Sequence, residues 1–354
     1  MFARSCALIF LSSALMAPAQ TPTSADVQSA NDVQSANLAP TINSKVIHNV
    51  MRYVADRELL RLAPDRSLDF GMLAASLVAT SHAVGDSRYA RPVEAALDQF
   101  QWRLEHTTDP THDYAIAQAI LLDTHDEQDL AALRRRLDLD IEDASQSSDP
   151  AFPDALRLYL MGSAAAEMSA VNSDPSYAAF EQRQWIKTQR LLYDPAAHLY
   201  ALDQNKEKTA LGDGLALAAL ARIISALPGD DPIRPGYVQM QRDMTQTIVS
   251  LQGPDGLWHT RLSDKTSPSD ATGSALILFA LASAINHRHI DAITYLPVCE
   301  RSWRALVAEV RTDGRIGPAQ PVRGTQIGDS NDFAQGAFLL AASEMDQIAQ
   351  HKHW

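Results

Sequence analysis

The chain has 354 residues, of which 46% are hydrophobic and 21% are charged, and its formal net charge is −13. This composition indicates a soluble globular protein with a large core, and the negative charge argues against nucleic acids and anionic membranes as partners. With only 2 cysteines, a small disulfide scaffold and a zinc site built on cysteines are excluded.

The first residues, 1–19, have the three parts of a secretory signal peptide. A short basic start containing Arg4 precedes the apolar run CALIFLSSALM, and Ala17 and Ala19 stand where a signal peptidase reads small residues. We expect cleavage near Ala19, a periplasmic or secreted location, and no membrane insertion afterwards. Loss of Arg4 would take the net charge from −13 to −14 and leave Cys299 as the only cysteine.

Residues 20–40 are polar and contain the sequence DVQSAN twice. This composition is typical of a flexible linker. Folding is therefore expected to start near Ile42, and residues 41–354 are expected to form a single domain.

From Ile42 onward the apolar spacing is helical, and no convincing strand pattern occurs. Two kinds of helix alternate. One kind is apolar nearly all round and should be buried on most sides: FGMLAASLVATSHAV, YAIAQAILL, ALRLYLMGSAAAEM, GLALAALARIISAL, ATGSALILFALASAI and FAQGAFLLAASEM. The other kind is amphipathic, as in YVQMQRDMTQTIVSL and ITYLPVCERSWRALVAEV.

We count six helices of each kind, the first amphipathic one running from about Ile42 to Leu62. Six repeats of about 50 residues indicate an array that closes on itself. An all-α (α/α)6 barrel satisfies this pattern, with six inner helices surrounded by six outer helices that face water.

An aspartate stands at or beside the start of each apolar helix. Aspartate caps free N–H groups and suits the positive end of the helix dipole. A barrel also brings all six inner starts to one end, where like charges would raise some pKa values and allow a carboxyl group to donate a proton. The six residues are Asp69, Asp113, Asp154, Asp213, Asp270 and Asp332.

The region from about His112 to Met345 resembles glycoside hydrolase family 105, the unsaturated rhamnogalacturonyl hydrolases. More distantly it resembles family 88, the unsaturated glucuronyl hydrolases. The segments that carry the resemblance, in register, are PDALRLYLMG, LLYDPAAHLY, GDGLALAALARIISALPGDDP, LQGPDGLWHTRLSD, DATGSALILFALASAIN and DFAQGAFLLAASEM.

The resemblance implies an enzyme that releases a 4,5-unsaturated uronic acid from the non-reducing end of an oligosaccharide made by a lyase. Hydration of the enol-ether double bond needs a proton donor and a group that orients water. Asp154 aligns with the proton-donating aspartate of the family, and Asp113 with a second carboxylate. His112 is a further candidate for the pocket.

The chain departs from the family at the fourth inner helix. Where the family usually carries Arg-Gly-Asn-Gly-Trp, this sequence reads Leu211-Gly212-Asp213-Gly214-Leu215. The missing arginine would be a natural partner for the uronate carboxylate, and the missing tryptophan a natural platform for a sugar ring.

Other residues are candidates for binding the substrate. Trp258 and His259 in DGLWHTRL could form a sugar wall, with Arg261 or Lys265 supplying charge. Arg157, one turn after Asp154, could bind the substrate carboxylate or hold Asp154 in place. The helix-head residues Asp213, Asp270 and Asp332 complete the set.

No metal and no cofactor are expected. The acidic stretch DLDIED lacks the glycine and terminal glutamate of a calcium loop and is interpreted as a solvated helix end. Two alternatives to the unsaturated uronyl hydrolase remain: a barrel hydrolase of a less charged sugar, and a catalytically silent barrel that binds carbohydrate. The oligomeric state is not predicted.

Overall fold

The computed structural model describes residues 35–101, 103–104, 110–123, 127–149, 151–319 and 331–351, and Ser35 begins one compact unit. The expected signal peptide and most of the expected linker lie outside these residues. The backbone N–H of Ala36 donates to the carbonyl of Val310 at 2.8 Å, so the folded unit begins before the expected start near Ile42. None of the described helices is long and apolar enough to cross a membrane.

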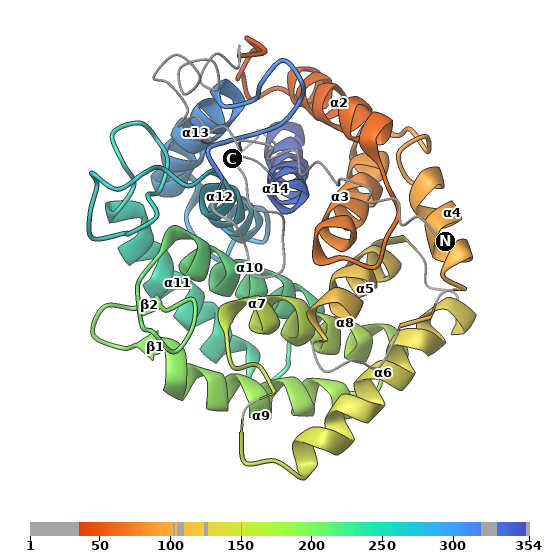
Figure 1. Cartoon of the computed structure of the whole chain (residues 1–354). Helices are drawn as coiled ribbons and strands as arrows, with labels where there is room; N and C mark the ends of the chain where they lie inside the picture. The colour runs from red at the N-terminus through yellow and green to blue at the C-terminus, as the bar shows by residue number, and fades with distance from the viewer. Residues whose placement is uncertain are drawn as a thin grey trace, which may run out of the picture. The chain divides into compact units, whose positions relative to one another are not determined.

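Two concentric rings of helices make up this unit (Figure 1). The inner ring contains α3 (Leu68–Val84), α5 (Thr111–Asp123), the continuous α7–η1–α8 (Ala155–Arg157, Leu158–Gly162, Ser163–Asn172), α10 (Ala210–Ala226), α12 (Ala271–Asn286) and α14 (Asp332–Gln350). The outer ring contains α2 (Ser44–Arg61), α4 (Arg91–Gln99), α6 (Glu127–Ser145), α9 (Pro175–Leu192), α11 (Arg234–Ser250) and α13 (Ala292–Ala308). Because α14 packs against α3, the inner ring closes, which confirms the (α/α)6 barrel.

A two-stranded antiparallel hairpin, β1 (Tyr193–Asp194) and β2 (Leu199–Tyr200), lies between α9 and α10. The sequence analysis did not predict it, because two residues per strand are too few to show alternation.

Inner and outer helices differ in burial as their sequences predict. Every residue of α12 from Ala271 to Ile285 is buried. On the outer helix α13, one face is buried, including Cys299, Trp303 and Leu306. The burial of apolar area on both rings supplies the main driving force for folding.

Glycines allow neighbouring inner helices to approach closely at their first turns. A Cβ atom on Gly71 of α3 would lie 2.5 Å from the carbonyl carbon of Ala115 on α5. A Cβ atom on Gly273 of α12 would lie 2.6 Å from the backbone nitrogen of Leu211 on α10. Both contacts join first turn to first turn, so these neighbouring inner helices start at the same end of the barrel.

The helix-head aspartates have two different local roles. Asp154 and Asp270 are themselves N-caps, of α7 and α12. The caps of α3, α10 and α14 are instead Ser67, Thr209 and Asn331, and the aspartates of these helices stand within the first turn. The prediction of an aspartate at or beside each start is therefore confirmed, whereas capping by that aspartate is confirmed for only two.

An ionisable group is buried between two outer helices. Glu181 of α9 has no exposed surface, and the hydroxyl of Tyr237 on α11 donates to its two oxygens at 3.2 and 3.0 Å. Burial raises the pKa of Glu181 to about 8, although the hydrogen bond from Tyr237 opposes this shift. In the folded protein the neutral acid is therefore favoured up to mildly alkaline pH.

Replacing Gly273 by alanine should destabilise the barrel by about 1–3 kcal/mol, because the new methyl group has no room against α10. Gly236, the third residue of the outer helix α11, has nothing within 4 Å of its would-be Cβ and is the matched control. Gly236→Ala should be neutral or stabilising by up to ~1 kcal/mol. Urea unfolding of the two variants measures the difference, and equal effects would contradict the close approach.

The stability of the protein should fall as the pH rises from about 4.5 to about 8, because the folded state keeps a proton on Glu181 that the unfolded chain releases. Thermal unfolding across this range should show a smaller slope for Glu181→Gln, which cannot ionise. Glu58, with a pKa raised to about 7, contributes a residual slope of the same sign. The exposed Asp230→Asn is the control, and a slope unchanged by Glu181→Gln would refute the assignment.

Candidate active site

Asp154 is held at the start of its helix by contacts from both sides. Its Oδ1 accepts the backbone N–H of Arg157 at 2.8 Å, and the next backbone N–H, of Ala155, donates to the carbonyl of Leu202. Before it, the carbonyl of Phe152 accepts the hydroxyl of Thr188 on α9 at 2.6 Å. The side chain of Asp154 is half-buried, so a fixed carboxyl group remains partly accessible.

A π-helical turn, η1, follows directly after the Asp154 helix start. Such turns leave carbonyl groups without their usual partners and often occur near functional sites. Here the side chain of Gln118 on α5 donates to the carbonyl of Leu160 at 3.0 Å, and the hydroxyl of Ser163 donates to the carbonyl of Tyr159. The irregular turn is therefore fixed from the neighbouring inner helix.

Asp113 stands in the first turn of α5, the inner helix that packs against η1 and α8. Its carboxylate forms an ion pair with Arg136 of the outer helix α6, with Oδ2 3.1 Å from Nη1. The Arg136 side chain is only 2% exposed, and that of Asp113 5%. His112 precedes Asp113 and is half-buried. The structure thus brings Asp113 and Asp154 to the starts of adjacent inner helices.

Asp332 lies on another side of the ring, with Asp69. The two line a cavity of about 360 Å³ together with Arg61 and Arg315. Burial raises the pKa of Asp332 above its ordinary value, while Arg315 opposes this shift. Asp69 accepts the backbone N–H of Phe333 at 3.2 Å, which ties the start of α3 to the start of α14.

Asp213 and Asp270 are fully buried. The backbone N–H of Tyr200 in β2 donates to Asp213 at 2.7 Å, and burial raises the pKa of Asp213 well above its ordinary value. Asp270 accepts the backbone N–H of Thr272 at 3.0 Å. Both carboxyl groups are thus held by backbone N–H groups of the barrel wall, and their expected contacts with a substrate stay a prediction.

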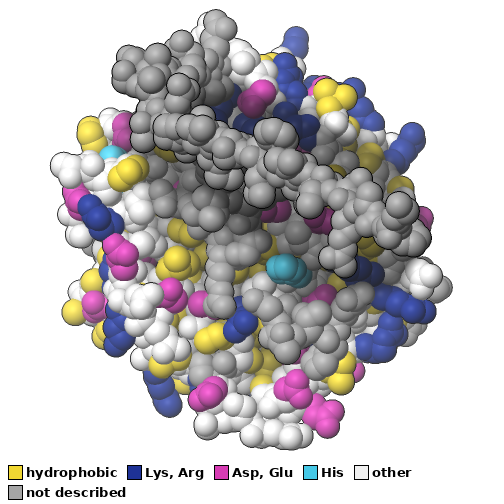
Figure 2. Space-filling model, in the orientation of Figure 1, with side chains coloured by type: hydrophobic (Ala, Val, Ile, Leu, Met, Phe, Trp, Pro, Cys, Tyr) yellow, Lys and Arg dark blue, Asp and Glu magenta, His cyan; other side chains and the backbone are white. Residues whose placement is uncertain are grey.

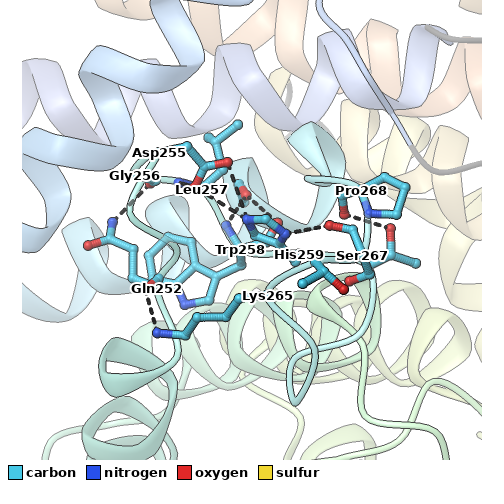
Figure 3. Close-up of polar contacts among 12 residues, drawn as sticks. Gln252, Asp255, Gly256, Leu257, Trp258, His259, Lys265, Ser267 and Pro268 are labelled. Carbon is cyan, nitrogen blue, oxygen red and sulfur yellow. Dashed lines mark hydrogen bonds and ion pairs between the residues drawn. The ribbon is translucent and has the colours of Figure 1, made fainter.

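The expected sugar wall is built differently (Figure 3). Trp258 has no exposed surface, and its indole N–H donates to the carbonyl of Ile248 at 2.7 Å, so it belongs to the core. His259 contacts the carbonyl of Ser267 at 2.5 Å and the carboxylate of Asp255 at 3.2 Å, which fixes the ring within its own loop. The indole face is therefore not available for stacking on a sugar.

The replacements for the family arginine and tryptophan are also placed by the structure. Leu211 is 4% exposed and Leu215 fully buried, so both positions have become part of the core of α10. Arg261 is exposed and paired with Asp264. Arg157, one turn into the Asp154 helix, is half-buried and remains the nearest described cation to Asp154 along the chain.

Figure 2 shows acidic side chains toward the middle of the face in view. A cavity of about 450 Å³ lies where the last turns of the inner helices meet, with Ala79, Leu121, Ala221 and Leu340 in its wall. Because the carboxylates of Asp113 and Asp154 stand at the starts of their helices, we place the candidate active site at the start end. The described residues contain no group of three or more side chains suited to hold a metal ion.

The sequence analysis missed Arg136 and misread Asp140. It interpreted DLDIED as a solvated helix end, yet Asp140 accepts the hydroxyl of Tyr114 at 2.6 Å and two nitrogens of Arg136 at 3.0 and 3.2 Å. The spacing of four residues between Arg136 and Asp140 is the helical signal that could have revealed the pair.

The sequence model of glycosyl hydrolase family 88 matches residues 43–349. The chain belongs to this family. This confirms the resemblance to the two families named from the sequence, of which family 88 is the one whose model matches. Among the described residues, the match spans both rings of helices, from the start of α2 to one residue before the end of α14.

The chain is similar to proteins named as unsaturated rhamnoglycuronyl or rhamnogalacturonyl hydrolases. An unsaturated 3S-rhamnoglycuronyl hydrolase of Formosa agariphila is 31% identical over 200 residues, which are 50% of this chain and 53% of the relative. The chain spans about half the length of the curated relatives it matches.

Solved structures share the fold across nearly the whole chain. A family-88 glycosyl hydrolase from Bacteroides vulgatus superposes with a TM-score of 0.78 at 23% identity, covering 86% of this chain and 99% of the other. A protein described as a polysaccharide lyase gives the same TM-score, 0.78, at 20% identity, covering 88% and 99%. At these identities the likeness concerns the fold.

Proposed function

We propose that the protein is a glycoside hydrolase that removes a 4,5-unsaturated uronic acid from the non-reducing end of oligosaccharides produced by a polysaccharide lyase. The observation that carries the proposal is the family-88 match over residues 43–349, with Asp113 and Asp154 at the starts of adjacent inner helices. The Formosa relative, named for an unsaturated rhamnoglycuronyl substrate, supports the same substrate class.

In the proposed reaction Asp154 gives its proton to C4 of the unsaturated sugar. Water then adds at C5 and returns a proton to the Asp154 carboxylate, so the acid is regenerated. The resulting hemiketal opens at the C5–O5 ring bond, which leaves a ketone at C5 and a hemiacetal at C1. Collapse of this hemiacetal breaks the glycosidic bond and releases an open-chain keto sugar together with the shortened oligosaccharide. Asp113 assists by accepting a hydrogen bond from the water. No cofactor takes part in this scheme.

The substrate is proposed to be of the pectin or rhamnogalacturonan type, with a non-reducing unsaturated uronate. Leu211 and Leu215 stand where the family usually has arginine and tryptophan, and both leucine side chains are buried in the core. This favours a changed contact to the uronate carboxylate, for which Arg157 is the candidate. A polysaccharide lyase with the same fold shows that the barrel alone does not select the reaction.

Asp154→Asn should lower kcat for unsaturated disaccharides by roughly 10²–10⁴-fold, because asparagine still caps the helix but cannot give a proton. The loss of ultraviolet absorbance of the conjugated C4=C5 bond measures the rate on lyase-made rhamnogalacturonan, rhamnoglycuronan and glucuronan fragments. Asp174 caps the outer helix α9 in the same way, by accepting the backbone N–H of Ser176 at 2.9 Å. Asp174→Asn is therefore the matched control and should keep full activity.

A folded wild-type protein that consumes none of these unsaturated fragments would refute the proposed function. The two alternatives would then be separated by offering neutral oligosaccharides: release of sugar indicates a hydrolase of a less charged substrate, and binding without turnover indicates a silent barrel.

We further propose that the protein is exported, to the periplasm or the medium. When the full chain is produced in a bacterial host with a working secretion system, the exported form should begin near Gln20. Mass spectrometry of the fractionated protein measures the new N-terminus, with Ala17 and Ala19 both changed to a bulky residue as the control that blocks cleavage. Intact Met1 on protein confined to the cytoplasm would contradict export.

A further inference from the structure

The outer helix α6 carries a buried arginine, Arg136, whose side chain reaches the first turn of the inner helix α5. Arg136 is 2% exposed, whereas its neighbour Arg135 on the same helix is exposed. Burying a guanidinium is costly unless its hydrogen bonds and charge are matched. Arg136 meets this condition by contacting two carboxylates, Asp113 on α5 and Asp140 on its own helix.

The guanidinium is clamped in one orientation. Nε and Nη2 contact the two oxygens of Asp140 at 3.0 and 3.2 Å, a two-point contact that fixes the plane of the group. Tyr114 braces the clamp, because its hydroxyl donates to Asp140 at 2.6 Å and its ring centroid lies 5.8 Å from the guanidinium carbon. The remaining nitrogen, Nη1, lies 3.1 Å from Oδ2 of Asp113 and forms the ion pair with it.

We propose that Arg136 is a positioning residue for the proposed hydration, which holds Asp113 as a fixed, ionised carboxylate that accepts a hydrogen bond from the reacting water. The two carboxyl groups then have different roles. Asp113 stays charged, and Asp154 gives and regains the proton. This inference rests on the proposed function, and it adds a residue on the outer ring to the machinery.

Several other titratable or charged groups lie within this cluster or on the elements packed against it. Tyr114 remains neutral, because burial, reinforced by Asp140, raises its pKa well above the ordinary value. His112 precedes Asp113 on α5, Asp154 and Arg157 lie at the start of the adjacent inner helix, and Asp69 lies at the start of α3 on the other side. The two carboxylates and one guanidinium in direct contact carry a net charge of −1.

The test is the pH profile of kcat/KM for the full mature chain on an unsaturated disaccharide. In Arg136→Met the acidic limb should move to higher pH by roughly 1–3 units, because Asp113 loses the opposite charge that favours ionisation. Asp140→Asn should move the same limb to lower pH, because it removes a like charge from the neighbourhood while keeping the shape. Arg136→Lys should give a smaller upward shift than Arg136→Met, and Arg135→Met should leave the profile unchanged.

A merely structural role for Arg136 predicts loss of stability or of total activity with an unmoved acidic limb, and that result in a folded Arg136→Met or Arg136→Lys variant would overturn the proposal. So would shifts of the same direction in Arg136→Met and Asp140→Asn.

A second readout separates this inference from the proposed function. Carbon-13 NMR of aspartate side-chain carboxyls, with Asp113→Asn to assign the signal, follows the ionisation of Asp113 without any substrate. The Asp113 signal should titrate at higher pH in Arg136→Met than in the wild type. If the wild type is inactive on every unsaturated uronide but this NMR shift occurs, the proposed function is wrong and the control of Asp113 by Arg136 is supported. If the titration of Asp113 is unchanged, the inference is wrong whatever the activity.

Discussion

The close contact between the first turns of the inner helices is the constraint on which the rest of this barrel depends. Gly71 and Gly273 bring α3 against α5 and α12 against α10 at distances that no side chain would allow. Helices that meet at their first turns place their free N–H groups and their capping residues around one opening. The way in which the wall closes therefore determines which side chains surround the opening. Each aspartate at a helix start either contacts the barrel wall or lies beside the opening.

The outer ring does more than cover the inner ring. On α9, Thr188 holds the segment before Asp154, and on α6, Arg136 reaches Asp113. Both carboxylates of the candidate site thus sit on inner helices, while outer helices contribute a contact to Asp113 itself and to the segment before Asp154. A site supported in this way keeps its geometry even though its loops vary, because packed helices are more rigid than loops.

The fold was predictable from the sequence because the composition of each helix indicates how much of its surface is buried. The apolar sequence of α12 assigns it to the inner ring, and the single apolar stripe of α13 assigns it to the outer ring. Neither assignment requires knowledge of the neighbouring helices. The site was less predictable. Whether Trp258 stacks on a sugar or fills the core, and whether Asp213 faces the opening or β2, depends on side-chain directions set by packing between distant segments. Arg136 escaped notice because a charged residue on an amphipathic helix ordinarily points to water.

The π-helical turn η1 inserts one extra residue into the Asp154 helix without turning the start of that helix. One residue in an α-helix corresponds to a rotation of about 100°, whereas a π-turn closes i→i+5 hydrogen bonds and takes up one residue more per turn. The extra residue between Leu158 and Gly162 is therefore absorbed within η1. Loss of that residue would restore a regular helix and leave both α8 and the direction of Asp154 nearly as they are, so chains with and without it can present the same carboxyl group at the same opening.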